Sequence, residues 1–215
     1  MHAKQSFATA FPSRAWERGD EGNSNLRESA CSAVKKQETM QQLHQALKDR
    51  FQVGELTEQR PDLAFVTVPK EQLRSLLLHL RDQEGFTHLV LLTAVDWLED
   101  ATFQLTYLMN NRLACRDLGV RVMLPRDTAS MDSIHDLWPT AATYQRELRE
   151  MFGIDFPDSP RVDEDFILEG WIRTPPYRRD FDTLQFSDEV FAPRPGRESS
   201  DPAEFMKEKL YPDGT

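Results

Sequence analysis

Histidine and cysteine, the side chains that most often carry catalysis or bind metals, are few in this chain of 215 residues. A metal site needs three or four converging ligands, but no two histidines stand at the i, i+4 spacing of one helix face and none lies beside a cysteine. The pattern predicts structural or surface histidines and no metal site in this chain. The five histidines are His2, His44, His79, His88 and His135.

The remaining catalytic candidates are equally sparse. Cys31 and Cys115 form no C-x-x-C pair, which argues against cysteine-ligated clusters and a disulfide scaffold and favours a reducing compartment. Arg116 is the only neighbouring charge that would favour a thiolate at Cys115, and no base is identifiable. With 9 glycines and no phosphate-binding glycine motif, the sequence predicts neither catalytic nor cofactor-binding residues.

The overall charge narrows the choice of partner. The chain has 36 Asp and Glu residues and 26 Lys and Arg residues, which give a net charge of −10. This negative charge disfavours binding to nucleic acid phosphates or anionic lipid. No apolar run approaches the roughly 18–20 residues of a membrane span, and residues 1–13 do not have the pattern of a secretory signal. Proteins or small molecules are the expected partners.

Charge is concentrated in one part of the chain. Residues 147–169 hold eight acidic residues and two arginines, and a basic group follows at Arg173, Arg178 and Arg179. Arg146 and Glu150 stand at i, i+4, where they can pair on one helix face. Such alternating blocks suit charge-assisted binding to a complementary surface, or a surface loop that pairs with itself. The sequence leaves both interpretations open.

Hydrophobic periodicity predicts the secondary structure. Apolar residues at three- and four-residue intervals indicate helices over 39–51, from Pro69 to about Gly85, and over 133–137 and 140–152. Alternating or continuous apolar runs indicate strands over 63–68, 86–94, 102–109 and 118–124, with 86–94 a buried central strand. Eight of the 13 prolines then fall in the last 59 residues, where the sequence predicts little regular structure.

These elements predict an α+β fold: two N-terminal helices, a mostly antiparallel sheet, a helix pair and a long extended C-terminal tail. The predicted domains are a mobile extension (1–38), an α+β domain (39–156) and an extended partner-binding tail (157–215). The tail is rich in aromatic and aliphatic residues. Such a segment is expected to lie along another surface, either its own domain or a partner.

The helix over 140–152 and the residues that follow it resemble a known family, the thirty-kilodalton (C-type) subunits of respiratory complex I, the NADH-quinone oxidoreductase. Weaker agreement upstream, over 92–97, 103–108 and 133–142, extends the resemblance to about residues 38–191. The residues that carry it are Arg146, Glu147, Glu150, Phe152, Gly153, Arg178, Arg179, Asp180 and Phe181.

The resemblance implies a peripheral-arm subunit without a redox centre, at the cytoplasmic face of the cell membrane. It would pack against the larger hydrogenase-like subunit that shapes the quinone site, with the motif residues at the interface and the tail lying across that neighbour. NADH, flavin, iron–sulfur clusters and quinone would bind partner subunits. The assembly would pass electrons from NADH to quinone and translocate protons.

The sequence departs from the family pattern at two places near the motif. Gln145 stands where the family usually has glutamate, and Asp158-Ser159-Pro160 stands where it has Gly-His-Pro. These departures leave the branch of the family open, so an alternative is the equivalent subunit of an energy-converting membrane-bound nickel–iron hydrogenase or ferredoxin-linked complex. A further alternative, from another class, is a stand-alone enzyme using Cys115 or the carboxylates near Asp163.

Overall fold

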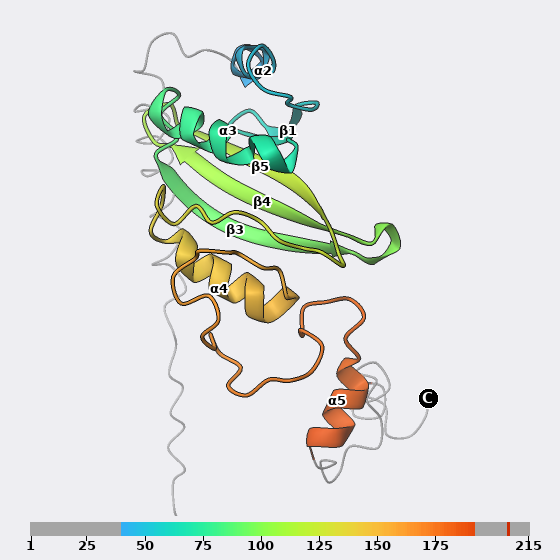
Figure 1. Ribbon diagram of the computed structural model, residues 1–215. Helices are drawn as coiled ribbons and strands as arrows, with labels where there is room; N and C mark the ends of the chain where they lie inside the picture. The colour runs from blue at the N-terminus through green and yellow to red at the C-terminus, as the bar shows by residue number, and fades with distance from the viewer. Residues whose placement is uncertain (1–39, 192–205, 207–215) are drawn as a thin grey trace, which may run out of the picture. The chain divides into compact units, whose positions relative to one another are not determined.

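Figure 1 shows the computed structural model, which describes residues 40–191 and residue 206. The chain divides into two compact units, Met1–Arg178 and Arg179–Thr215. In the first unit the elements are α2 (Met40–Lys48), β1 (Thr57–Arg60), β2 (Leu63–Thr67), α3 (Lys70–Asp82), β3 (His88–Trp97), a short 3-10 turn (Leu98–Asp100), β4 (Thr102–Asn111), β5 (Arg116–Pro125) and α4 (Ala141–Phe152). The second unit contains α5 (Thr183–Val190).

The five strands form one sheet in the order β1-β2-β5-β4-β3. Strands β3, β4 and β5 make an antiparallel meander, as short connections favour. β2 pairs with β5 in parallel, with Ala64 opposite Leu118. The predicted α+β fold with a mostly antiparallel sheet is confirmed.

One face of the sheet carries the core. Along β4, Phe103, Leu105, Tyr107 and Met109 are fully buried, and the residues between them are half-exposed. This alternation is the period of two that a sheet covered on one face requires. The helices supply the cover, with α3 packed against β5 and α4 against β3 (Figure 1).

The N-terminal helices form where the periodicity predicts them. Met40, Leu43 and Leu47 are the buried stripe of α2. α3 begins after Pro69, whose extended backbone suits a helix start, and buries four leucines at helical spacing. Gly85 follows the end of α3 with a φ of +76°, a conformation that glycine adopts without strain.

The strand predicted over 86–94 forms as β3 but lies at the edge of the sheet, so the prediction of a central strand was wrong. Its continuous apolar run is typical of a strand buried on both faces. In the structure Leu91, Val95 and Trp97 are each about 40% exposed, on the face opposite the core. β1 was not predicted because all four of its residues are exposed and lack an apolar pattern.

Two further corrections concern helices. Residues 133–137 form a single turn in place of the first helix of the predicted pair, with the amides of Leu137 and Trp138 both bonded to the carbonyl of Ile134. Pro139 follows at once and disfavours helical backbone before it. Helix α5 was missed, although Pro176 and Pro193 leave room for it and Asp182 caps its first turn by accepting from the Gln185 amide at 2.9 Å.

Candidate partner-binding site

The motif residues are organised around the C-terminal end of α4. The helix buries Leu148, Met151 and Phe152 against the core and ends at Gly153, whose φ is +74°. The Gly153 amide donates to the carbonyls of Arg149 and Leu148, which is a common way for helices to end. A Cβ on Gly153 would lie 2.8 Å from Arg178 Nη2, so a side chain at this position would require the Arg178 guanidinium to shift.

Glu150 holds the segment that follows α4. One carboxylate oxygen accepts hydrogen bonds from the backbone amides of Phe166, Ile167 and Leu168 at 2.6, 3.1 and 3.1 Å. The other accepts from the Ile167 amide at 2.9 Å. Bonds from amides to an ionised carboxylate are stronger than neutral ones, so Glu150 fixes three consecutive residues of the chain onto α4.

Arg146 and Glu147 lie on the same helix. The Arg146 guanidinium sits 5.2 Å from the centre of the Phe166 ring, within the range of a cation–π contact. Arg146 therefore contacts the same segment that Glu150 holds. Glu147 is half-buried on α4.

Arg178 closes the same segment at its far end. Its Nε donates to the Phe152 carbonyl at 2.6 Å, and its guanidinium lies 5.5 Å from the centre of the Phe103 ring. The neighbouring Tyr177 donates its amide to the Met151 carbonyl at 3.0 Å and packs its ring edge-on against Phe152. Two carbonyls in the last turn of α4, which have no partner within the helix, thereby anchor residues 177 and 178.

A buried ion pair, which the sequence analysis missed, supports this arrangement. Arg126 bonds both carboxylate oxygens of Asp96 at 3.0 and 3.1 Å, and the Asp96 side chain is 1% exposed. The Arg126 guanidinium also lies 5.8 Å from the centre of the Phe103 ring. The signal in the sequence was an aspartate at the end of an apolar strand, which needs a partner when it is buried.

A buried polar network joins α4 to the segments before and after it. Gln145 is fully buried, and its Oε1 accepts from the hydroxyls of Ser133 at 2.8 Å and Ser159 at 2.7 Å. Ser133 also contacts His135 Nδ1 at 2.9 Å. Gln145 Nε2 is buried without a hydrogen-bond partner among the described residues.

The nine motif residues therefore fall into two groups. Five of them, Arg146, Glu150, Phe152, Gly153 and Arg178, meet around the end of α4, and Glu147 lies on the same helix. Arg179, Asp180 and Phe181 belong to the second unit. There the Phe181 and Phe186 rings lie 5.6 Å apart, and Phe186 and Phe191 lie 6.3 Å apart.

The residues considered for a stand-alone enzyme, Cys115 and the carboxylates near Asp163, lie at the surface. Cys115 is exposed between β4 and β5, and its sulfur lies 3.7 Å from the Arg112 carbonyl oxygen. The Asp163 side chain is 80% exposed and meets Arg149 at 3.5 Å. A hydrogen bond from Arg161 lowers the pKa of the neighbouring Glu164. These carboxylates lack the contrasting environments of an acid–base pair.

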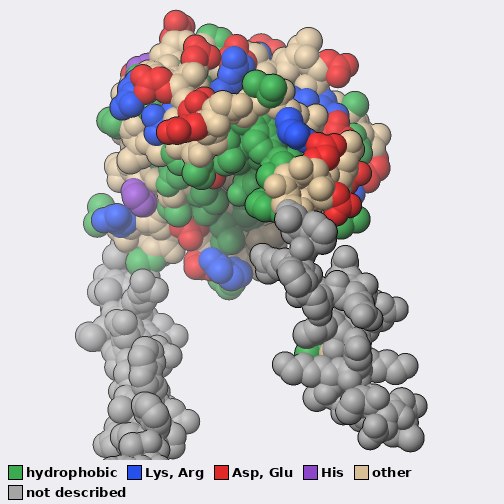
Figure 2. Space-filling view, turned by 90° about the horizontal axis from the view of Figure 1, so that it is seen from below, with side chains coloured by type: hydrophobic (Ala, Val, Ile, Leu, Met, Phe, Trp, Pro, Cys, Tyr) green, Lys and Arg blue, Asp and Glu red, His purple; other side chains and the backbone are tan. Residues whose placement is uncertain are grey.

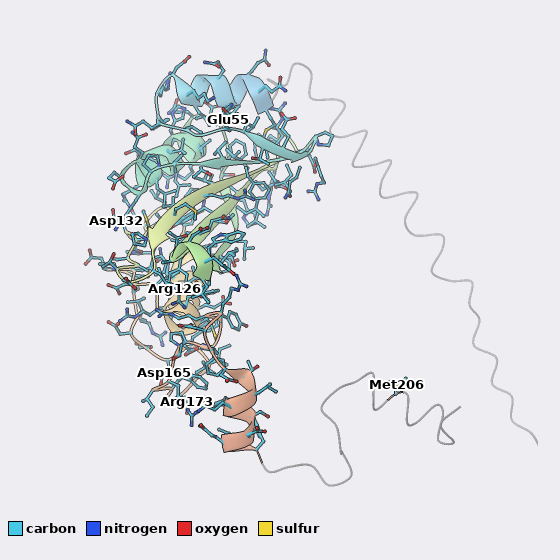
Figure 3. The ribbon with its side chains drawn as sticks, turned by 90° about the vertical axis from the view of Figure 1, so that its right-hand side faces the viewer. Glu55, Arg126, Asp132, Asp165, Arg173 and Met206 are labelled. Carbon is cyan, nitrogen blue, oxygen red and sulfur yellow. The ribbon has the colours of Figure 1, made fainter. Side chains whose placement is uncertain are left out.

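The segment after α4 also borders an open cavity of about 250 Å³ against that helix. Asp165 and Arg173 both line this cavity and lie near each other in Figure 3. Its lining mixes both signs of charge. In the part of the chain that is described, we find no group of three His, Cys, Asp or Glu arranged to hold a metal ion. None of the described helices has the length and apolar character needed to cross a membrane.

Known proteins are similar to this chain in sequence and in fold. The model of the family described as "Respiratory-chain NADH dehydrogenase, 30 Kd subunit" matches residues 66–187. The C-type NADH-quinone oxidoreductase subunit of Citrifermentans bemidjiense is 34% identical over 138 residues, which cover 63% of this chain and 84% of that protein. A C/D-type NADH-quinone oxidoreductase subunit of Aquifex aeolicus is 29% identical over 161 residues, 72% of this chain and 25% of that longer protein.

A solved structure adds a likeness of fold. A chain of the membrane-bound sulfane sulfur reductase, an archaeal respiratory membrane complex, superposes with a TM-score of 0.67 and 26% identity. The match covers 74% of this chain and 95% of that one. The family model spans more than half of the chain and includes the residues clustered at the end of α4. This chain therefore belongs to the family of the 30 kDa subunit of respiratory-chain NADH dehydrogenase.

Proposed function

We propose that this chain is a non-redox subunit in the peripheral arm of a proton-translocating NADH:quinone oxidoreductase. In this proposal it packs against the hydrogenase-like subunit that forms the quinone site and supports electron transfer from NADH to quinone. NADH, flavin, iron–sulfur clusters and quinone bind other subunits. The chain contributes no catalytic residue and associates peripherally with the cytoplasmic face of the cell membrane.

The observation that carries the proposal is how the motif uses its charges. Glu150 binds three backbone amides and Arg178 binds the Phe152 carbonyl. These two side chains hold the local backbone in shape and are therefore not available to bind a substrate. The name of the Aquifex aeolicus relative joins the C and D designations in one chain. This supports a direct contact between this chain and the subunit designated D, to which we assign the place of the hydrogenase-like subunit.

The experiment is purification of the full chain, carrying an affinity tag, from membranes of its own organism, followed by identification of its partners by mass spectrometry. We expect the other subunits of an NADH:quinone oxidoreductase to co-purify with it. We also expect NADH:quinone activity in the purified assembly and none in the isolated chain. Recovery of the tagged chain without subunits of any respiratory complex would overturn the proposal.

The likeness to the sulfane sulfur reductase chain supports a second candidate. In that case the chain serves the related position in an energy-converting hydrogenase or a ferredoxin-linked membrane complex. The same purification separates the two candidates. Co-purified nickel–iron hydrogenase or sulfur reductase subunits, with no NADH-oxidising subunit, favour the second.

A further inference from the structure

The sheet has a second face, opposite the core, that the described helices leave open to solvent. An antiparallel sheet with one covered face normally turns polar side chains to water on the other. The strand register places twelve residues side by side on this face, and we call them the open patch. They are Leu91, Thr93, Val95 and Trp97 of β3, Thr102, Gln104, Thr106 and Leu108 of β4, and Gly119, Arg121, Met123 and Pro125 of β5.

The open patch is largely apolar and carries a single charge. Leu91, Val95, Trp97 and Met123 are each between 39% and 42% exposed on it, and Arg121 is its one charged member. In the whole chain 29% of the residues are charged. Figure 2 shows, in the view from below, how acidic and basic side chains lie among apolar ones on the surface. A patch with so few charges is therefore unusual for this protein.

The fold holds Arg121 in a fixed position. Its guanidinium lies 4.1 Å from the centre of the Phe65 ring, a cation–π contact. The Phe65 ring lies over Gly119, where an added Cβ would meet it at 2.3 Å. The ion pairs found among the described residues do not include Arg121, and Asp117, at the hairpin end of the same face, is bonded to Asn110 at 2.7 Å. The open patch thus presents an ordered cation to a partner.

These residue types favour another protein as the occupant. Tryptophan, methionine and arginine are enriched at protein interfaces, where lysine and acidic residues are depleted. A second copy of this chain fits poorly, because Arg121 lies on the central strand of the sheet and a two-fold contact would bring two like charges together. Sheet faces are commonly covered by helices, and a helix on this face would need a carboxylate opposite Arg121.

We propose that an amphipathic helix of a partner subunit packs on the open patch. Its apolar side chains contact Val95, Trp97 and Met123, and one Asp or Glu on the same helix face pairs with Arg121. This interface lies on the face of the sheet opposite the core, away from the motif residues at the end of α4. The inference rests on the proposed function only in that the chain works within an assembly, and it holds for either candidate complex.

The first test is hydroxyl-radical footprinting of the full chain in membranes of its own organism and after isolation. We expect Trp97 and Met123 to be oxidised at least fivefold more slowly in the membranes, as measured by mass spectrometry. The rate at Leu113, which is 83% exposed at the tip of the β4–β5 hairpin, should not change. Equal rates at Trp97 and Met123 in both preparations, or equal protection of Leu113, would overturn the inference. Slow oxidation in the isolated chain would also overturn it, because its own terminal segments or a second copy would then cover the open patch.

The second test asks for the carboxylate. Arg121→Glu is expected to bring oxidation of Trp97 and Met123 in membranes to within twofold of the isolated chain, whereas Arg121→Lys keeps most of the protection because the charge remains. Arg112→Glu, the same charge change at an exposed hairpin position, is the matched control and should behave as wild type. Thermal unfolding shows whether each variant folds, and Val95→Asp, which should also lose protection, tests the apolar contact without altering Arg121.

The two proposals can fail separately. Full protection in both Arg121→Glu and Val95→Asp would refute the inference. Respiratory subunits that co-purify with a chain whose open patch is unprotected would overturn the inference and leave the proposed function standing. A protected patch in a chain that captures no respiratory subunit would overturn the proposed function and leave the inference standing.

Discussion

Ser159 donates its hydroxyl to Gln145 at 2.7 Å inside the protein, and both side chains are buried. The resemblance to the family implies glutamate and histidine at these two positions, where this chain has glutamine and serine. The structure therefore brings two separate departures into direct contact. A neutral hydrogen bond at this buried site avoids the cost of burying an ionised group.

Gln145→Glu is predicted to destabilise the protein at neutral pH, by about 2 kcal/mol, because burial opposes ionisation of the new carboxyl group. Burial would raise its pKa above the value of about 4.3 in the unfolded chain. The loss of stability relative to wild type should therefore be small at pH 4, where the carboxyl group is largely protonated in both states. It should grow as the pH rises towards the pKa in the folded state, and then level off. Urea unfolding at several pH values, compared with wild type at each, measures it.

The control for this prediction is Gln41→Glu, at an exposed position of α2, which should change stability little at any pH. Adding Ser159→His to Gln145→Glu is expected to recover part of the loss, because an imidazolium beside the carboxylate offsets its burial. Additive effects in this double-mutant cycle would contradict a direct coupling of the two positions.

Glu150→Gln is predicted to loosen the loop that Glu150 holds. The amide side chain lacks the charge that strengthens the bonds to residues 166–168, and loss of such bonds typically costs about 1–3 kcal/mol. Hydrogen exchange at the amides of Phe166, Ile167 and Leu168 should accelerate at least tenfold. Glu147→Gln, one turn earlier on α4, is the matched control, and equal acceleration in both variants would refute the specific role of Glu150.

Gly153→Ala is predicted to cost about 1–2 kcal/mol from the left-handed backbone alone. A further penalty comes from the contact with Arg178 Nη2, which an added Cβ would meet at 2.8 Å. When Gly153→Ala is made in an Arg178→Ala background, the loss of stability caused by the contact should vanish. The loss caused by the left-handed backbone should remain. Chemical denaturation of the four proteins of this cycle tests the separation, and an unchanged penalty would exclude crowding by Arg178.

Asp96→Asn is predicted to be the most damaging of these changes, at about 3–5 kcal/mol, because it leaves the largely buried Arg126 without its charged partner. Asp62→Asn is the control. Asp62 pairs with Arg60 at 3.1 Å, but more than half of each side chain is exposed, so its loss should cost less than about 1 kcal/mol. Thermal and urea unfolding of both variants gives the comparison, and similar losses would argue against a structural role for the buried pair.

The sequence alone was sufficient for those features that depend on neighbouring residues. The four leucines of α3 and the alternation of β4 predict a helix and a half-buried strand, because each requires only a local period. The motif spacing likewise identified the family. Local reasoning failed at residues 133–137, where too few residues precede Pro139, and at β3, whose apolar run does not reveal that it lies at a sheet edge.

Only the tertiary structure decided what each motif residue touches. Glu150 binds amides 16 to 18 residues further along the chain, Arg178 reaches back 26 residues to Phe152, and Asp96 pairs with Arg126 across 30 residues. No spacing rule predicts such partners, because they are set by where the loops return the chain to the core. The resemblance implied that Glu150 and Arg178 lie at a partner interface, and in the structure both bind groups of the protein's own fold. A charged group that is removed from water is stable only when it has a partner close by.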